Sequence, residues 1–292
     1  NIDGVEIHIY EESNTDGGTI TPVGNYKIIQ NVPFISQLPK YPTGCESVST
    51  VMALNYVGVN IAVDDFIDKY LEKGNRNSFD PNICFGGNPY SKSGYGCYSP
   101  VIKKALDNIL YDSLLYAKEV QGKSISYLCS EYIDRDIPVI FWATQHMEKP
   151  RNGTKIPYNN KYIQWISPMH CLLLVGYDDT HYIFHDPQEH AKTFYSKESV
   201  EAAYKGLFMQ AIVISNRIKE LDRLDRQQLT KTYYFTKQIG ESNLQSSDFN
   251  DYNALACLQL LYTYYFDKQD YEKTDFLYDE MINIRKLNPS YK

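Results

Sequence analysis

The residues that follow Gly44 mix apolar and polar types at the spacing of an α-helix. The apolar positions of this segment are Val48, Val51, Met52 and Tyr56. They would share one face of a helix, and Gly58 is a typical residue at a helix end. Thr43 and Glu46 have the spacing of a capping box, which would satisfy the first backbone amides. The pattern therefore predicts a helix from Cys45 to Tyr56, with Cys45 in its first turn.

Apolar runs further along the chain predict both strands and helices. Residues 171–175 and 182–184 have the pattern of a β-hairpin. We also predict strands at 138–142 and 208–214, a helix at 125–133, and a helix from Ser99, as cap, through Pro100 to about Leu110. The stretches 77–98 and 145–168 are rich in Gly, Pro, Asn and Lys. Loops of that length are usually functional, so we expect these to form cleft walls.

The register of the predicted hairpin depends on its loop. A loop of residues 176–180 places His170 opposite Asp186 and on the same face of the sheet. A loop of residues 178–181 places His170 opposite Glu189 instead, and Asp186 then needs a β-bulge to reach it. The apolar pattern alone leaves both registers open.

Candidate chemistry comes from Cys45, His170 and Asp186, in that order along the chain. A cysteine, then a histidine, then a carboxylate on a short hairpin is the papain-like arrangement for attack on an acyl carbon. The thiol needs a base, and the base needs a third group to orient its ring. Gln37, before the cysteine, is placed to stabilise an oxyanion. Such a triad would require the register in which His170 faces Asp186.

The predicted position of Cys45 in a first helical turn also bears on its reactivity. The positive end of the helix dipole favours a thiolate, so we expect the pKa of this cysteine to be lowered. The neighbouring Glu46 is interpreted as a helix cap rather than as a second acid. The other interpretation of Cys45 is a small buried residue, and the presence of Gln37, His170 and Asp186 argues against it.

Several stretches of the sequence together resemble the C39-like cysteine peptidases. They are Val32-Pro33-Phe34-Ile35-Ser36-Gln37, Pro42-Thr43-Gly44-Cys45-Glu46, Asn88-Pro89-Tyr90 with Ser93-Gly94-Tyr95-Gly96-Cys97, Pro138-Val139-Ile140-Phe141-Trp142, Trp165-Ile166-Ser167-Pro168-Met169-His170-Cys171, Gly176-Tyr177-Asp178 and Asp186-Pro187. The resemblance covers about residues 27–216. It implies an α+β, papain-like fold, with Cys45 as nucleophile, His170 as base, Asp186 as orienting group and Gln37 in the oxyanion hole.

The resemblance predicts a cysteine peptidase that cleaves a peptide or isopeptide bond through a thioester on Cys45. An acyltransferase or transpeptidase would use the same thioester with an amine as acceptor. A catalytically silent peptide-binding module is a third interpretation. A silent module has no chemical need for Cys45, His170, Asp186 and Gln37 together, so we favour an enzyme.

The character of the sequence changes after about Asn216. Residues 218–239 and 251–287 have helical patterns, and the second stretch weakly resembles a tetratricopeptide-like helical hairpin. We therefore predict an N-terminal arm or hairpin at 1–26, a peptidase domain at 27–216 and a C-terminal helical domain at 217–292. The helices could bind a protein partner or mediate self-association, or simply stabilise the enzyme.

Composition and net charge limit the kinds of binding partner and the cellular locations that we expect. The net charge of −7 argues against nucleic acid as a partner. The resemblance to C39-like peptidases implies a peptide or protein as the substrate. The sequence has no apolar run long enough to span a membrane. It begins at Asn1 rather than Met, which is compatible with a removed N-terminal segment and an extracellular or cell-surface location, although a cytoplasmic one stays open.

The histidines and remaining cysteines predict neither a metal site nor a cofactor. His181, His185 and His190 cluster without the helical spacing of a zinc site. Six cysteines at irregular spacing suit no dense disulfide framework. Cys84 and Cys97 could pair in an oxidising compartment. The others besides Cys45 are expected to be buried thiols, namely Cys129, Cys171 and Cys257.

Overall fold

The computed structural model describes residues 21–111, 113, 115–216, 262, 265–266, 273–275, 277–279 and 281–282. The chain divides into two compact units, one of residues 1–111 with 116–214 and the other of residues 112–115 with 215–292. The predicted arm lies largely outside the described residues, as does most of the predicted helical domain. The tetratricopeptide-like hairpin therefore stays a prediction, and Cys257 also lies outside the described part.

The described elements run in the following order. They are β1 (Lys27–Ile28), α1 (Cys45–Tyr56), α2 (Val63–Asp65), a π-helical turn (Phe66–Tyr70), β2 (Lys73–Gly74), β3 (Phe85–Gly86), α3 (Ser99–Ile109), β4 (Leu115–Glu119), α4 (Ile125–Glu131), a 3₁₀ turn (Ile133–Arg135), β5 (Val139–Thr144), a second 3₁₀ turn (Gln145–Met147), β6 (Arg151–Tyr158), β7 (Lys161–Ser167), β8 (Met169–Tyr177), β9 (His181–His185), β10 (Thr193–Ser196), α5 (Lys197–Gly206) and β11 (Ala211–Asn216).

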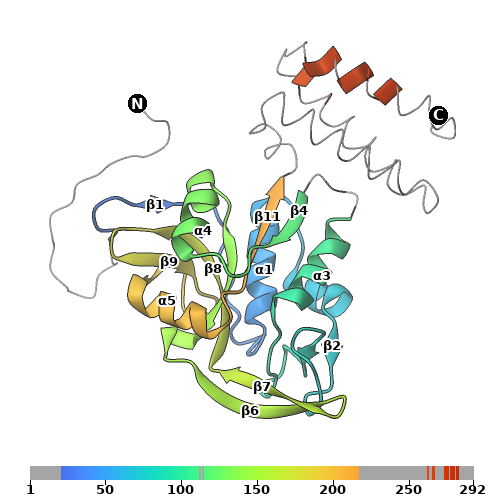
Figure 1. Ribbon diagram of the computed structural model, residues 1–292, viewed down its shortest axis with the longest axis vertical. Coiled ribbons are helices and arrows are strands. Elements are labelled where there is room, and N and C mark those ends of the chain that lie inside the picture. Colours follow the sequence, from blue (N-terminus) through green and yellow to red (C-terminus); the bar gives the residue numbers. More distant parts are fainter. Residues whose placement is uncertain are drawn as a thin grey trace. The chain divides into compact units, whose positions relative to one another are not determined.

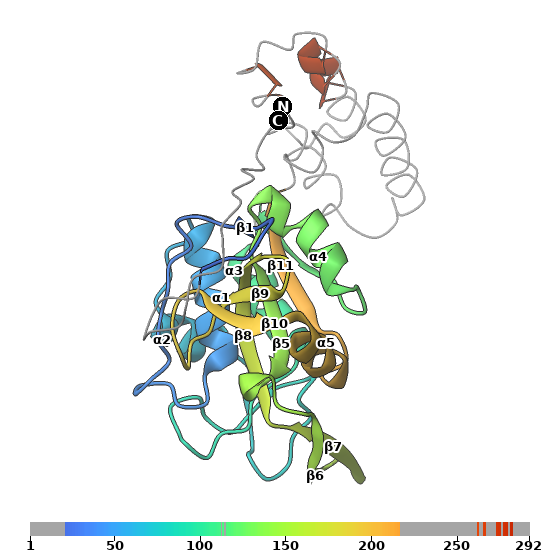
Figure 2. The same cartoon turned by 90° about the vertical axis from the view of Figure 1, so that its left-hand side faces the viewer.

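A seven-stranded sheet of order β10-β9-β8-β5-β11-β4, with β1 paired to β8, forms the centre of the first unit. Helix α1 packs on one face, and α4 and α5 pack on the other (Figures 1 and 2). Successive side chains of β5 point to opposite faces of the sheet, which explains the two layers of helices. Phe141 lies in the same core cluster as Leu128 of α4 and Tyr204 of α5, whereas the buried Trp142 points to the opposite face. The result is the α+β architecture expected from the sequence.

Helix α1 has the bounds predicted from its apolar spacing, Cys45–Tyr56. The predicted capping box is wrong, because the N-cap is Gly44 and no side chain caps the helix. The hydroxyl of Thr43 donates to the carbonyl of Ser91, 2.9 Å away. The carboxyl of Glu46 accepts a hydrogen bond from the backbone amide of Cys97. Both side chains that would form the box therefore take part in tertiary contacts.

The predicted hairpin is confirmed as β8 and β9, but the register that the triad required is wrong. Tyr177 pairs with Tyr182, so the loop is residues 178–181, and the register shifts between Leu174 and Gly176. The side chain of Asp178 fixes this loop, since its carboxylate accepts a hydrogen bond from the Thr180 amide at 2.7 Å. The hairpin thus has the second of the two candidate registers near its turn, together with the bulge that this register needs.

Three other expectations are corrected. Residues 151–167 do not form a loop, because β6 and β7 make an antiparallel hairpin in a sheet of its own. This hairpin extends away from the main sheet in Figures 1 and 2. Ser99 begins α3 but does not cap it, since its hydroxyl donates to Glu119 at 2.7 Å. The last strand starts at Ala211, after Phe208 and Met209 turn the chain with positive φ.

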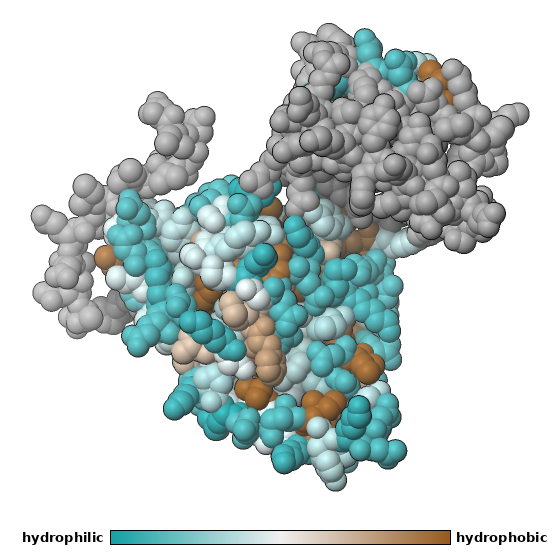
Figure 3. All heavy atoms as spheres, in the orientation of Figure 1, coloured by the Kyte–Doolittle hydropathy of each residue, from teal (hydrophilic) through white to brown (hydrophobic). Residues whose placement is uncertain are grey.

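The face of the described part that Figure 3 shows is mostly hydrophilic, with small separate hydrophobic spots. Within the described residues, no helix is both long enough and apolar enough to cross a bilayer. Cys84 and Cys97 are free thiols in this structure, so the disulfide considered for them is absent. Cys129 and Cys171 are buried free thiols, as predicted.

Candidate active site

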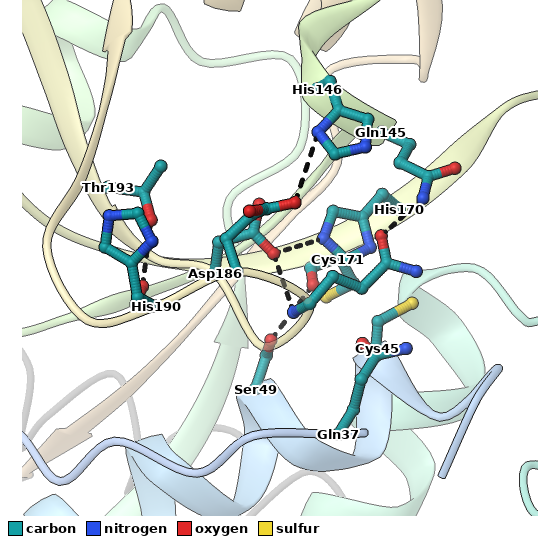
Figure 4. Close-up of polar contacts among 12 residues, drawn as sticks. Gln37, Cys45, Ser49, Gln145, His146, His170, Cys171, Asp186, His190 and Thr193 are labelled. Carbon is teal, nitrogen blue, oxygen red and sulfur yellow. Dashed lines mark hydrogen bonds and ion pairs between the residues drawn. The ribbon is translucent and has the colours of Figure 1, made fainter. Parts of the chain in front are cut away.

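The predicted site residues come together at one end of the sheet. Strand β8 begins there, the antiparallel β9 ends there, and α1 starts at the same place. Figure 4 shows Cys45 on α1, His170 on β8 and Asp186 after β9 around one centre, with Gln37 beside Cys45. Ser49 ties the helix to this strand, because its hydroxyl donates to the carbonyl of Cys171 at 3.1 Å.

The pair of His170 and Asp186 is buried and closely bonded. Nε2 of His170 lies 2.8 Å from Oδ1 of Asp186, and the two side chains are 1% and 0% exposed. Oδ1 also accepts the Gln188 amide at 3.0 Å, and Oδ2 accepts the Tyr195 hydroxyl at 2.7 Å. Burial by itself would raise the pKa of Asp186, but His170 and these donors outweigh it and hold the pKa below its usual value. The carboxylate can therefore orient the imidazole through Nε2, which leaves Nδ1 for chemistry.

Cys45 is buried beside a carboxyl group rather than poised as a free thiolate. Its Sγ donates to Oε2 of Glu46 across 3.2 Å. Among the hydrogen bonds of the described residues, none joins this sulfur to His170. Burial, followed by the charge of Glu46, raises the pKa of the Cys45 thiol well above its usual value. The prediction of a lowered pKa from the helix dipole is therefore wrong for this arrangement, because desolvation and a neighbouring acid outweigh the dipole.

Glu46 is a second acid at the site. The side chain is 0% exposed, and its Oε1 accepts the backbone amide of Cys97 at 2.6 Å. Burial raises the pKa of Glu46 to about 7, against the hydrogen bond from Cys97 and smaller effects of Cys45 and His170. The sequence pattern assigned this residue to a helix cap, which the structure contradicts. Only the tertiary contact with the segment before α3 reveals its position.

Gln37 lies next to the candidate nucleophile with its amide buried. Its Nε2 donates to the carbonyl of Pro42 at 3.2 Å, and its backbone amide donates to Pro187 at 2.8 Å. An amide nitrogen carries two hydrogens, so one remains for a bound oxygen. The Oε1 atom of Gln37 is buried without a protein partner. The backbone bond also ties Gln37 to the loop that carries Asp186.

Tyr195 and Gln188, which the sequence did not mark as site residues, support the loop that carries Asp186. Nε2 of Gln145 donates to Oε1 of Gln188 at 2.8 Å, and His146 Nδ1 lies 3.5 Å from Glu189 (Figure 4). These contacts join the turn after β5 to the loop after β9. A tyrosine nine residues after the acid carries no local sequence signal, because its role depends on the pairing of β10 with β9.

The histidines expected not to bind metal have structural hydrogen bonds. His181 contacts Asp178 in the hairpin loop, and Nε2 of His185 lies 3.1 Å from the carbonyl of Val32. The backbone carbonyl of His190 accepts the hydroxyl of Thr193 at 2.9 Å. In the described part of the chain, no group of three or more His, Cys, Asp or Glu residues is arranged to hold a metal ion.

The sequence profile of the Peptidase_C39 like family matches residues 29–212. The chain therefore belongs to this family of cysteine peptidase-like proteins. It is 26% identical over 180 residues to the uncharacterized protein YvpB of Bacillus subtilis (strain 168), a match that covers 60% of this chain and 70% of YvpB.

Among solved structures, the protein is similar to a candidate C39-like peptidase from Bacillus anthracis. The sequence identity is 28% and the TM-score 0.60, and the match covers 66% of this chain and 98% of the other. The family and its α+β peptidase fold, expected from the sequence motifs, are thus confirmed.

Proposed function

We propose that the protein is a cysteine peptidase that cleaves peptide or isopeptide bonds through an acyl-enzyme on Cys45. The observation that carries this proposal is the buried hydrogen bond of 2.8 Å between His170 and Asp186, at the same end of the sheet as Cys45. A buried imidazole with one nitrogen held by a carboxylate has its other nitrogen oriented for proton transfer. Family membership supports the same reaction class.

Acylation begins when the sulfur of Cys45 attacks the carbonyl carbon of the substrate. His170, as imidazolium, gives its proton to the leaving amine, and a thioester remains on Cys45. His170 then takes a proton from water, which attacks the thioester and releases the acid. Asp186 keeps the imidazole in one orientation throughout and stabilises its charged form.

The oxyanion that forms during both steps needs hydrogen-bond donors. Gln37 has an amide hydrogen free for this purpose, and Cys45 itself supplies a backbone N–H in the first turn of α1. The first backbone amides of a helix lack intrahelical acceptors, so they are available to a bound anion. One such donor typically contributes about 10²- to 10³-fold to turnover.

The decisive experiment screens peptide libraries with the full chain and with its variants. Cys45→Ala and His170→Ala should each lower kcat/KM by about 10⁴-fold or more. Cys45→Ala should leave the melting temperature nearly unchanged, whereas His170→Ala leaves the buried Asp186 without its partner and should lower it. Cys129→Ala removes another buried thiol and serves as the matched control, with near-normal turnover expected. Full activity in Cys45→Ala would refute the proposal.

The same assay distinguishes hydrolysis from acyl transfer. Both reactions share the thioester on Cys45, and only the acceptor differs. Mass spectrometry of the products in the presence of an added amine would show the free acid for a peptidase. An acyl-amine as the main product would identify a transferase instead.

A further inference from the structure

The mechanism above assigns no role to the second buried acid of the site, Glu46. Its two carboxyl oxygens have different partners. Oε1 accepts the amide of Cys97 at 2.6 Å, and Oε2 contacts the sulfur of Cys45 at 3.2 Å. A purely structural acid would not need the second contact, because the first already satisfies the buried amide.

The surroundings of Glu46 are shaped to hold this carboxyl against the sulfur. Gly96 has φ +133°, and a Cβ atom there would lie 2.6 Å from Oε1 of Glu46. A larger residue at Gly96 would therefore press on this acid and on the end of the Met169 side chain, whose Cε would lie closer still. The hydroxyl of Thr50, one turn along α1, donates to the backbone carbonyl of Glu46 at 2.6 Å, so the main chain is fixed as well.

The titratable groups around Glu46 come from three elements. Cys45 lies on the same helix, and Cys97 precedes α3. His170 of β8 acts on Glu46 through its charge, and Cys171 acts on Cys45. The nearest group in this set that can carry a positive charge is His170, which Asp186 already neutralises. An ionised Glu46 is thus poorly compensated, and it opposes negative charge on Cys45.

We propose that Glu46 is a further catalytic residue, whose protonated carboxyl donates a hydrogen bond to the Cys45 thiolate and whose ionisation returns the sulfur to the thiol form. This inference rests on the proposed function, since it concerns the same nucleophile. Burial raises the pKa of Glu46 to about 7, so this carboxyl ionises within the pH range in which an enzyme works.

The proton balance links three groups. In the active form, the proton lies on His170 instead of Cys45, so that a Cys45 thiolate is paired with an imidazolium and Glu46 is an acid with its O–H directed at the sulfur. The imidazolium and this hydrogen bond together must offset the burial that raises the pKa of the thiol in the form seen in the structure. When Glu46 loses its proton to solvent, His170 passes its own proton to the sulfur. The resulting S–H donates to the carboxylate, which is the contact seen in the structure. That form has a neutral imidazole and no thiolate, so it cannot start the reaction.

The test measures the rate at which iodoacetamide alkylates Cys45 between about pH 5.5 and 8.5, with the labelled peptide identified by mass spectrometry. In the unmodified protein, the rate should fall about tenfold on passing above pH 7, because the active form declines with one ionisation. In Glu46→Gln, which keeps an acceptor for Cys97 and a donor for the thiolate, the rate should stay within about threefold over this range. Glu72→Gln removes an exposed carboxylate paired with Lys104 and should behave like the unmodified protein.

The outcomes separate this inference from the proposed function. If Cys45 reacts fast but Glu46→Gln has the same pH profile as the unmodified protein, the role of Glu46 is refuted and the peptidase proposal stands. If Cys45 is unreactive at every pH, both are refuted. If Glu46→Gln fails to fold, infrared spectroscopy of the unmodified protein provides the check. The infrared band of a protonated carboxyl should then vanish over the same pH range as the alkylation, and its absence at pH 6 would contradict the proposal.

Discussion

The site contains two buried carboxyl groups whose pKa values are shifted in opposite directions. Asp186 and Glu46 are both 0% exposed. The pKa of Asp186 is held low by His170, Tyr195 and a backbone amide, against the effect of burial. Burial dominates at Glu46 and raises its pKa to about 7. The number and charge of the donors, not the degree of burial, therefore decide which acid is ionised.

This contrast gives the two acids different tasks. An acid that stays ionised can hold an imidazolium, which suits Asp186 beside His170. An acid that carries its proton near neutral pH can donate to a thiolate, which suits Glu46 beside Cys45. Two carboxyl groups in different environments commonly divide roles in this way.

The largest expected effect is the loss of kcat when Asp186, the acid with the lowered pKa, is replaced. Asp186→Asn should lower kcat by about 10³- to 10⁴-fold, because an amide orients the imidazole poorly and cannot stabilise its charge. Glu46→Gln, measured at about pH 6, should lower kcat only a few-fold. The labelling rate with an acyl-mimicking electrophile serves as the readout until a substrate is found. Equal losses in the two variants would show that the acids do not differ in task.

A second expected effect concerns stability. The pKa of Glu46 rises from 4.5 to about 7 on folding, so the native state binds a proton more tightly than the unfolded state between these values. The free energy of unfolding should therefore fall as the pH rises from about 4.5 to 7, by on the order of 3 kcal/mol from this group. Asp186 acts in the opposite sense, because its stabilisation is lost on acidification.

Urea denaturation at pH 5 and pH 7.5 would measure this effect. Glu46→Gln should flatten the dependence of the free energy of unfolding over that interval, whereas Asp186→Asn should not. A Glu46→Gln protein with the same slope as the unmodified chain would mean that the carboxyl of Glu46 is ionised throughout.

The smallest expected effect comes from Tyr195. Tyr195→Phe removes one donor, at 2.7 Å, from Asp186 and should move the pKa of Asp186 upward. We expect kcat to fall by about tenfold or less, in line with the loss of one hydrogen bond to a charged group, and the acid limb of the pH profile to shift upward. Tyr177→Phe removes a similar hydroxyl bond of 2.7 Å to Asp134, outside the site, and is the matched control. An unchanged acid limb would assign Tyr195 a structural role alone.

The sequence predicted the elements of the site better than the contacts between them. Helix α1 and the hairpin of β8 and β9 follow from local apolar patterns, and these are the features that such patterns determine. The capping box failed because Thr43 and Glu46 find partners in a segment about fifty residues away. A spacing of Thr and Glu fits a cap and a buried acid equally well.

Two further misses have physical causes of the same kind. The register of the hairpin depends on the carboxylate of Asp178, which binds the amides of its own turn and fixes the loop at 178–181. The β6–β7 hairpin has a mainly exposed first strand, so its sequence lacks the alternation that marks a half-buried strand. A strand with few buried side chains has no alternation of apolar and polar residues by which the sequence could predict it.

The bulge at Val175 has a consequence for how this hairpin can change in evolution. It lets the turn and the site keep separate registers within one pair of strands. A residue gained or lost in the loop at 178–181 can be absorbed at the bulge, before the change reaches His170 and Asp186. The spacing of His170 and Asp186 is therefore set by the strand pairs on their own side of the bulge, separately from the turn, whose register Asp178 fixes.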